Sequence, residues 1–132
     1  MKSEIFSFFS SRALKLNEIQ ISMPAWIERF YGGRCHELFI LEVKTKEEAW
    51  SLEKSFTDFV KFNQQLLETL DSKEKSSILP FPKDGLPKKK NELVFSSAMD
   101  ERRFRLENYF KSTVFLFFFL KKKEIKNIIP TN

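Results

Sequence analysis

The chain has 132 residues, of which 42% are hydrophobic and 31% are charged. This length accommodates one domain of ordinary size, and this balance is typical of a globular protein and excludes a disordered chain. The single cysteine, Cys35, excludes a structural disulfide within the chain and suits a reducing compartment. The longest apolar run, Val114 to Leu120, is far shorter than the about twenty residues that span a bilayer.

The net charge of +5 is unevenly distributed along the chain. Residues 1–70 carry nine Lys and Arg against ten Asp and Glu, whereas residues 71–132 carry fourteen against eight. The excess positive charge therefore belongs to the second half. A one-sided basic surface indicates an anionic partner, such as a phosphoinositide membrane or a nucleic acid, although it also serves solubility.

The first part of the chain predicts three antiparallel strands after a lead-in whose apolar residues dock on the domain or form a short helix. Residues 19–23 alternate apolar and polar, and the strand either ends at Pro24 or resumes after a bulge. Gly32 and Gly33 predict a tight hairpin turn. Residues 37–44 and 49–56 are the second and third strands, with a turn at residues 45–47.

Beyond the strands the apolar spacing changes to that of an amphipathic helix, with Thr57 as its expected N-cap and polar residues 71–77 as its end. Residues 78–90 hold three prolines and four lysines and predict an extended basic loop. Ser96 or Ser97 is the expected cap of the next helix. The expected core comprises Ile21, Phe39, Leu41, Trp50, Leu52, Phe59, Phe62, Leu66, Leu106 and Tyr109.

The apolar residues 114–120 have two readings. Followed by three lysines, they suit a membrane-inserting finger whose lysines meet anionic headgroups. As part of a helix that is apolar all round they suit burial in the core, which is the reading we favour.

No catalytic motif stands out. The chain lacks a phosphate-binding glycine loop, and the neighbouring side chains of Cys35 and His36 diverge if both lie on a strand. One histidine and one cysteine cannot make a zinc site alone. We therefore expect neither an enzyme nor a metal or other cofactor.

The lysines of the loop and the arginines at 102, 103 and 105 are the residues that carry chemistry. Lysine offers a mobile point charge for phosphate and arginine a rigid bidentate fork, so together they suit an anion pocket. The alternative is a solvated surface with ordinary ion pairs.

The order of these elements resembles the PX (phox homology) domain, a phosphoinositide-binding module of sorting and signalling proteins. The resemblance covers about residues 19–111 and rests on Lys-Ser-Phe-Thr-Asp-Phe at 54–59, the Leu-Pro to Pro-Lys loop at 79–90, and Glu-Arg-Arg-Phe-Arg-Leu-Glu-Asn-Tyr at 101–109. It implies an α+β fold in which a three-stranded antiparallel meander packs against a helical half with a proline-rich loop. On this reading residues 1–17 are a lead-in, 18–120 the PX-like domain and 121–132 a basic tail, with residues 112–132 departing from the family pattern.

The resemblance also implies the roles of particular residues. Phe56 packs on the inositol ring, Arg102 holds ring hydroxyls, and Lys88, Lys89 or Lys90 contacts the 1-phosphate. Ser55 stands where family members that bind phosphatidylinositol 3-phosphate carry the arginine that holds the 3-phosphate. The family pattern therefore implies altered or weak headgroup selectivity.

We accordingly expect a cytoplasmic, non-enzymatic module that docks on endosomal or other phosphoinositide-bearing membranes, with Phe81 or Leu86 of the loop entering the bilayer. A protein-interaction adaptor that has lost lipid binding is the alternative, and Ser55 favours it. Nucleic acid is not favoured, because the strands lack an aromatic and basic stacking pattern. A dimer through the Phe-rich segment is possible, and nothing requires one.

Overall fold

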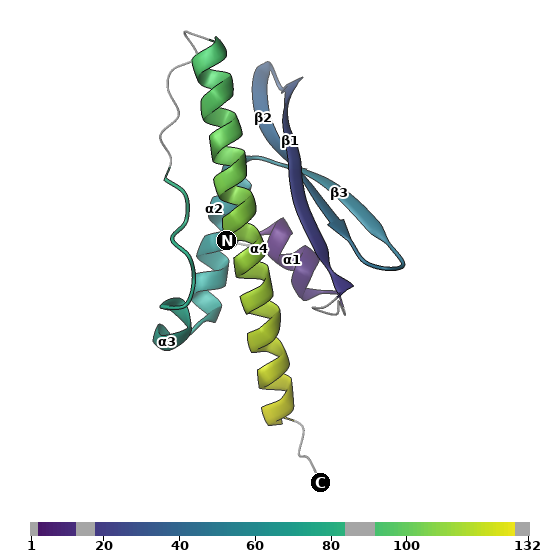
Figure 1. Cartoon of the computed structure of the whole chain (residues 1–132), viewed down its shortest axis with the longest axis vertical. Coiled ribbons are helices and arrows are strands. Elements are labelled where there is room, and N and C mark those ends of the chain that lie inside the picture. Colours follow the sequence, from purple (N-terminus) through teal and green to yellow (C-terminus); the bar gives the residue numbers. More distant parts are fainter. Residues whose placement is uncertain (1–2, 13–17, 84–91, 129–132) are drawn as a thin grey trace.

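The computed structural model describes residues 3–12, 18–83 and 92–128, with side chains up to residue 117. The elements in chain order are α1 (Glu4–Ser10), β1 (Gln20–Tyr31), β2 (Arg34–Lys44), β3 (Ala49–Lys54), α2 (Phe56–Thr69), α3 (Ser72–Lys75) and α4 (Glu92–Ile128). In Figure 1 the sheet lies on one side of the long helix α4, and α3 with residues 76–83 lies on the other. The α+β architecture predicted from the sequence is confirmed.

The sheet is the expected antiparallel meander, with strand order β1-β2-β3. The pairing of β1 with β2 runs from Gln20 opposite Lys44 to Tyr31 opposite Arg34, and its register shifts between Ser22 and Ala25. Pro24 lies within this shift, and its missing N–H group cannot join the ladder. The strand therefore bulges at Pro24 and resumes, which makes β1 longer than the predicted residues 19–23.

The two glycines of the β1–β2 turn both have positive φ, +59° at Gly32 and +73° at Gly33. Two consecutive positive values match the twist of the flanking strands, and glycine adopts them without steric cost. The predicted hairpin is confirmed. The turn fixes Arg34 as the first residue of β2.

The junction between β3 and α2 differs from the sequence prediction. We expected a strand that continues to Phe56 and a helix capped by Thr57, but β3 ends at Lys54 and Ser55 is the cap. The reason is a capping box, in which the Ser55 hydroxyl accepts from the Asp58 N–H and the Asp58 carboxylate accepts from the Ser55 N–H. Two orphan donors are satisfied at once, which one threonine cap does not achieve.

Two further predictions for the helices are corrected. Residues 72–75 form the short helix α3, capped by Asp71, where the sequence indicated only a polar end to the preceding helix. Helix α4 begins at Glu92, before the expected caps Ser96 and Ser97, and runs without a break to Ile128. Within its apolar segment Val114 is buried and Phe117 packs against the core, while Phe115 is 42% exposed.

One continuous core joins all these layers. Of the predicted core residues, Trp50 and Leu52 are half-buried at its edge and the others are buried. Helix α1 contributes residues that the sequence left open between docking and a short helix: its Phe9 ring packs edge-on against Phe110, and its Phe8 ring against Trp50. The aromatic side chains of α1 thus lie in the same cluster as those of α2 and α4.

Candidate functional site

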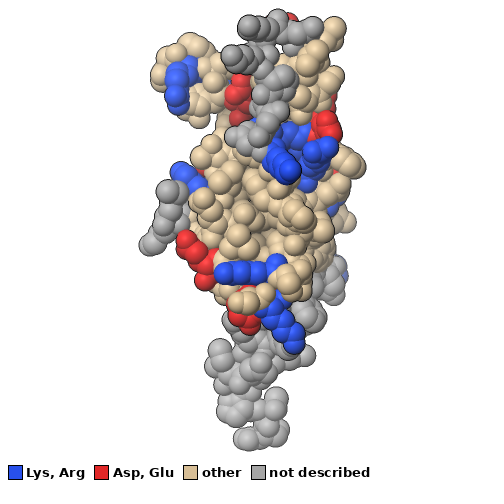
Figure 2. All heavy atoms as spheres, turned by 90° about the vertical axis from the view of Figure 1, so that its left-hand side faces the viewer, with Lys and Arg blue, Asp and Glu red and all other residues tan. Residues whose placement is uncertain are grey.

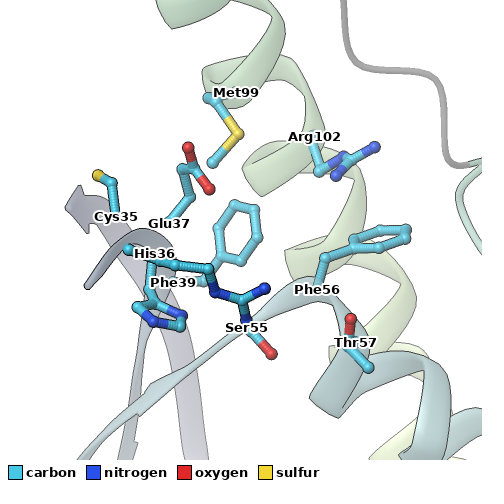
Figure 3. A pocket seen from close by; sticks show the side chains of 10 residues that line it. Cys35, His36, Glu37, Phe39, Ser55, Phe56, Thr57, Met99 and Arg102 are labelled. Carbon is cyan, nitrogen blue, oxygen red and sulfur yellow. The ribbon is translucent and has the colours of Figure 1, made fainter. Parts of the chain in front are cut away.

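A pocket of about 270 Å³ opens where the start of β2, the β3–α2 junction and α4 meet (Figure 3). Each element contributes side chains that lie far apart in the sequence, so the pocket exists only in the folded chain. The residues that line it are Arg34, Cys35, His36, Glu37, Phe39, Ser55, Phe56, Thr57, Met99 and Arg102.

Arg102 and Phe56 form one wall of this pocket. The guanidinium carbon of Arg102 lies 3.9 Å from the centroid of the Phe56 ring, and Arg102 is only 8% exposed. The stacked arrangement is visible in Figure 3. An aromatic face attracts a guanidinium and fixes its plane. Arg102 is thereby held in a defined orientation at the pocket.

The β3–α2 junction presents an uncharged corner of the pocket. The Ser55 hydroxyl accepts from the Asp58 N–H at 3.2 Å and donates to the Asp58 carboxylate at 3.0 Å. The same carboxylate accepts from the Ser55 N–H at 2.8 Å. Ser55 is therefore occupied in capping α2 and brings no positive charge to the pocket.

The cysteine and the histidine of the hairpin lie beside each other in sequence but contact different partners. The Cys35 thiol donates to the Glu28 carboxylate at 3.3 Å. The His36 ring stacks on Tyr31 with centroids 3.8 Å apart, and its Nε2 lies 3.1 Å from the Tyr31 carbonyl oxygen. This geometry orients His36 along its own hairpin.

The charged side chains that the hairpin side adds to the pocket are Arg34 and Glu37. Sequence reasoning missed both of them. A partial signal was present, because the Gly-Gly turn makes Arg34 the first residue of its strand. What the sequence did not reveal is that the fold carries this strand end to the same pocket as Arg102.

The structure brings together two of the residues that the sequence analysis singled out for the headgroup, Phe56 and Arg102. Leu86 and Lys88 to Lys90 lie outside the described residues. Phe81 is half-buried, with its ring centroid 5.4 Å from that of Phe56 and 5.1 Å from that of Tyr109. Its ring thus packs on a residue of the pocket wall, and membrane contact by Phe81 stays a prediction.

The remaining basic side chains of this region are engaged elsewhere. Arg103 donates to the Met23 carbonyl oxygen at 2.7 Å and Arg105 pairs with Glu101, so neither lines the pocket. Figure 2 shows the face at the left of Figure 1, where Lys and Arg of the described residues lie in separate small groups, some of them with Asp or Glu beside them.

A second, more open pocket of about 340 Å³ lies between α1 and β3. Its charged groups include Lys54 and Glu4, which form an ion pair, and Arg12, which stacks on the Phe8 ring at 3.8 Å. The charges of Glu4 and Lys54 thus offset each other there. Lys54 lines this second pocket, whereas its neighbour Ser55 lines the first.

A protein-family model described as the PX domain matches residues 42–129, about two thirds of the chain. The chain belongs to the PX domain family. The fold of this PX domain is similar to the X-ray structure of a designed CISK-PX domain, with a TM-score of 0.57 and 19% identity over 70% of this chain and 81% of that chain. No curated protein matches the sequence. The predicted family and fold class are confirmed.

Membership of the PX family supports a phosphoinositide-binding or membrane-trafficking module in general, and such modules associate peripherally with membranes and are typically not enzymes. Within the part of the chain that the structure describes, we find no helix that is both long and apolar enough to cross a membrane. The same residues contain no cluster of three His, Cys, Asp or Glu side chains suited to a metal ion.

Proposed function

We propose that this PX domain binds the headgroup of a phosphoinositide in the pocket between β2, α2 and α4, and so docks reversibly on cytosolic membrane surfaces. The observation that carries the proposal is the pair of Arg102 and Phe56, a buried guanidinium stacked on an aromatic ring at the pocket wall. Such a pair places an arginine of fixed orientation beside an aromatic ring, and guanidinium groups are well suited to the oxygens of an inositol phosphate.

The loop that precedes α4 would supply the remaining contacts. Lys88, Lys89 and Lys90 would approach the phosphate that links the ring to the lipid, and Leu86 would enter the bilayer, with Phe81 at the base of the loop. Each basic residue near an anionic surface contributes about 1 kcal/mol, which salt screens. Binding should therefore weaken as the salt concentration rises. Endosomal or other phosphoinositide-bearing membranes would be the sites of docking.

Headgroup selectivity should be altered or weak. Ser55 is uncharged and occupied in the helix cap, and Glu37 adds a carboxylate to the lining. The pocket thus offers fewer positive charges at this corner than the family pattern implies for recognition of a 3-phosphate.

The proposal is tested by co-sedimentation with phosphatidylcholine vesicles that carry one mono- or bisphosphorylated phosphoinositide at a time. Arg102→Met keeps an apolar stem against Phe56 and removes the charge, so we expect it to lose headgroup-selective binding. Arg105→Met is the matched control, because Arg105 lies on the same helix, is 61% exposed and pairs with Glu101 outside the pocket. If a folded wild-type sample binds none of these lipids, the proposal fails.

A protein-interaction adaptor is the second candidate function. Ser55 and Glu37 favour it, because both reduce the attraction of the pocket for a phosphate. The same vesicle experiment separates the two functions. If the protein binds no phosphoinositide, the adaptor function is favoured. If it binds one selectively and Arg102→Met abolishes that binding, the pocket still binds lipid and the adaptor alternative, which requires lost lipid binding, is excluded.

A further inference from the structure

Arg34 differs from every other arginine of the chain. All six arginines belong to the described residues. Arg29 pairs with Glu53 and Arg105 with Glu101, Arg12 and Arg103 donate to backbone carbonyl oxygens, and Arg102 stacks on Phe56. Among the described residues we find no hydrogen bond or ion pair to the Arg34 guanidinium. Arg34, for which the described residues provide no such partner, is thus also one of the arginines that line the pocket.

Arg34 brings a positive charge to the pocket from the β1–β2 hairpin, a different part of the fold from the helix that carries Arg102. Arg34 begins β2 and Arg102 lies in α4, so two separate elements each contribute one guanidinium to a single pocket. The β3–α2 junction contributes Ser55 to the same pocket, and Ser55 is neutral and occupied by its capping box. Among the described lining residues, Arg34 and Arg102 are therefore the fixed positive charges.

The acidic residues of the lining reduce the affinity of the pocket for an anion. Glu37 lines the pocket and opposes the two arginines, while the nearby Glu28 accepts from the Cys35 thiol. Among the described lining residues, two guanidiniums thus stand against one carboxylate. This charge suits a phosphomonoester, which can accept several charge-assisted hydrogen bonds from guanidinium groups.

We propose that Arg34 is the phosphate-binding residue of this pocket. From its place on the hairpin, Arg34 would do what an arginine at position 55 does in the family pattern. The ligand is a phosphomonoester carried on the inositol ring that Arg102 and Phe56 contact. This inference rests on the proposed function and deepens it, because it names the residue that holds the phosphate and the direction from which it does so.

The test compares Arg34→Ala with Arg29→Ala in wild-type background. Both arginines are exposed and lie on the same hairpin, and both substitutions remove one positive charge, but Arg29 is paired with Glu53 and does not line the pocket. Affinity is measured on vesicles that carry a monophosphorylated phosphoinositide, and on vesicles of the same charge that carry phosphatidylserine instead.

On phosphoinositide vesicles we expect Arg34→Ala to weaken binding about tenfold or more, because charge-assisted hydrogen bonds to the phosphate are lost. Arg29→Ala should change it by no more than about twofold, because an exposed pair contributes little. On phosphatidylserine vesicles the two variants should behave alike. Glu37→Gln should strengthen phosphoinositide binding, because it removes the opposing charge.

The remaining outcomes separate the two proposals. Competition with a soluble inositol phosphate distinguishes headgroup binding in the pocket from general attraction to an anionic membrane surface. The soluble inositol phosphate should block only binding in the pocket. If Arg34→Ala binds like wild type while Arg102→Met loses binding, the role of Arg34 is overturned and the lipid function stands. If Arg34→Ala and Arg29→Ala weaken binding equally on all vesicles, Arg34 acts only through net charge and the inference is again overturned. If wild type binds no phosphoinositide, both proposals fail.

Discussion

The guanidinium carbon of Arg102 lies 3.9 Å from the centroid of the Phe56 ring, and this contact joins helix α4 to the first residue of helix α2. It is therefore a structural contact as well as part of the candidate pocket. A double-mutant cycle of Phe56→Leu and Arg102→Met should give a coupling of about 1 kcal/mol in the free energy of unfolding, measured with urea. Additive effects of the two substitutions would show that the stack contributes nothing to stability.

The cap of α2 can be tested in the same way. Ser55→Ala removes the hydroxyl that accepts from the Asp58 N–H, and it should lower the free energy of unfolding by about 1 kcal/mol. Thr57→Ala is the control, because Thr57 is an exposed residue of the same helix turn and is not the cap. Equal effects of the two substitutions in urea unfolding would contradict the capping box.

The burial of Tyr109 should make the free energy of unfolding decrease at alkaline pH. Its hydroxyl donates to the Asn63 side-chain oxygen, and burial raises the pKa of Tyr109 above its ordinary value of about 10. A raised folded pKa means that the stabilisation is complete below the unfolded pKa and is lost as the pH rises above it. The loss for this group reaches at most about 1.4 kcal/mol per pH unit.

The measurement for Tyr109 is urea unfolding on both sides of pH 10, for wild type and for Tyr109→Phe. Phenylalanine has no proton to lose, so the variant should lose less stability than wild type as the pH rises. Lysines and the other tyrosine are common to both proteins and cancel in the difference. Parallel pH profiles would contradict the assignment to Tyr109.

Helix α1 should be required for stability. Phe9 is 1% exposed and packs edge-on against Phe110, so Phe9→Ala should cost about 3–5 kcal/mol of the free energy of unfolding. Ser7→Ala on the exposed face of the same helix should change stability little. A small effect of Phe9→Ala in thermal or urea unfolding would mean that α1 is not part of the core that the structure describes.

The sheet and most of the core were predictable because their signals are local. Alternation marked the strands, Gly32 and Gly33 marked the hairpin, and spacings of three and four marked the apolar face of α2. The bulge at Pro24 follows from the missing N–H of proline, and the sequence left it as one of two readings. The misplaced cap had a local cause as well, since Ser55 with Asp58 satisfies two backbone donors and Thr57 alone satisfies one.

The candidate site was predictable only in part. Phe56 and Arg102 were found because the family resemblance carried both of them. Arg34 was not found, because a local sequence pattern does not reveal which distant element will pack beside the end of a strand. The burial of α1 was left open for the same reason: the apolar residues of a short terminal helix do not reveal the surface that will cover them.

The most direct test of the account is an NMR titration of the isotope-labelled protein with soluble, short-chain phosphoinositides. The account predicts that the largest amide shifts come from the residues around Arg34, Phe56 and Arg102, and that Arg102→Met abolishes them. Shifts centred on the α1–β3 pocket near Lys54, or no shifts with any phosphoinositide, would contradict it.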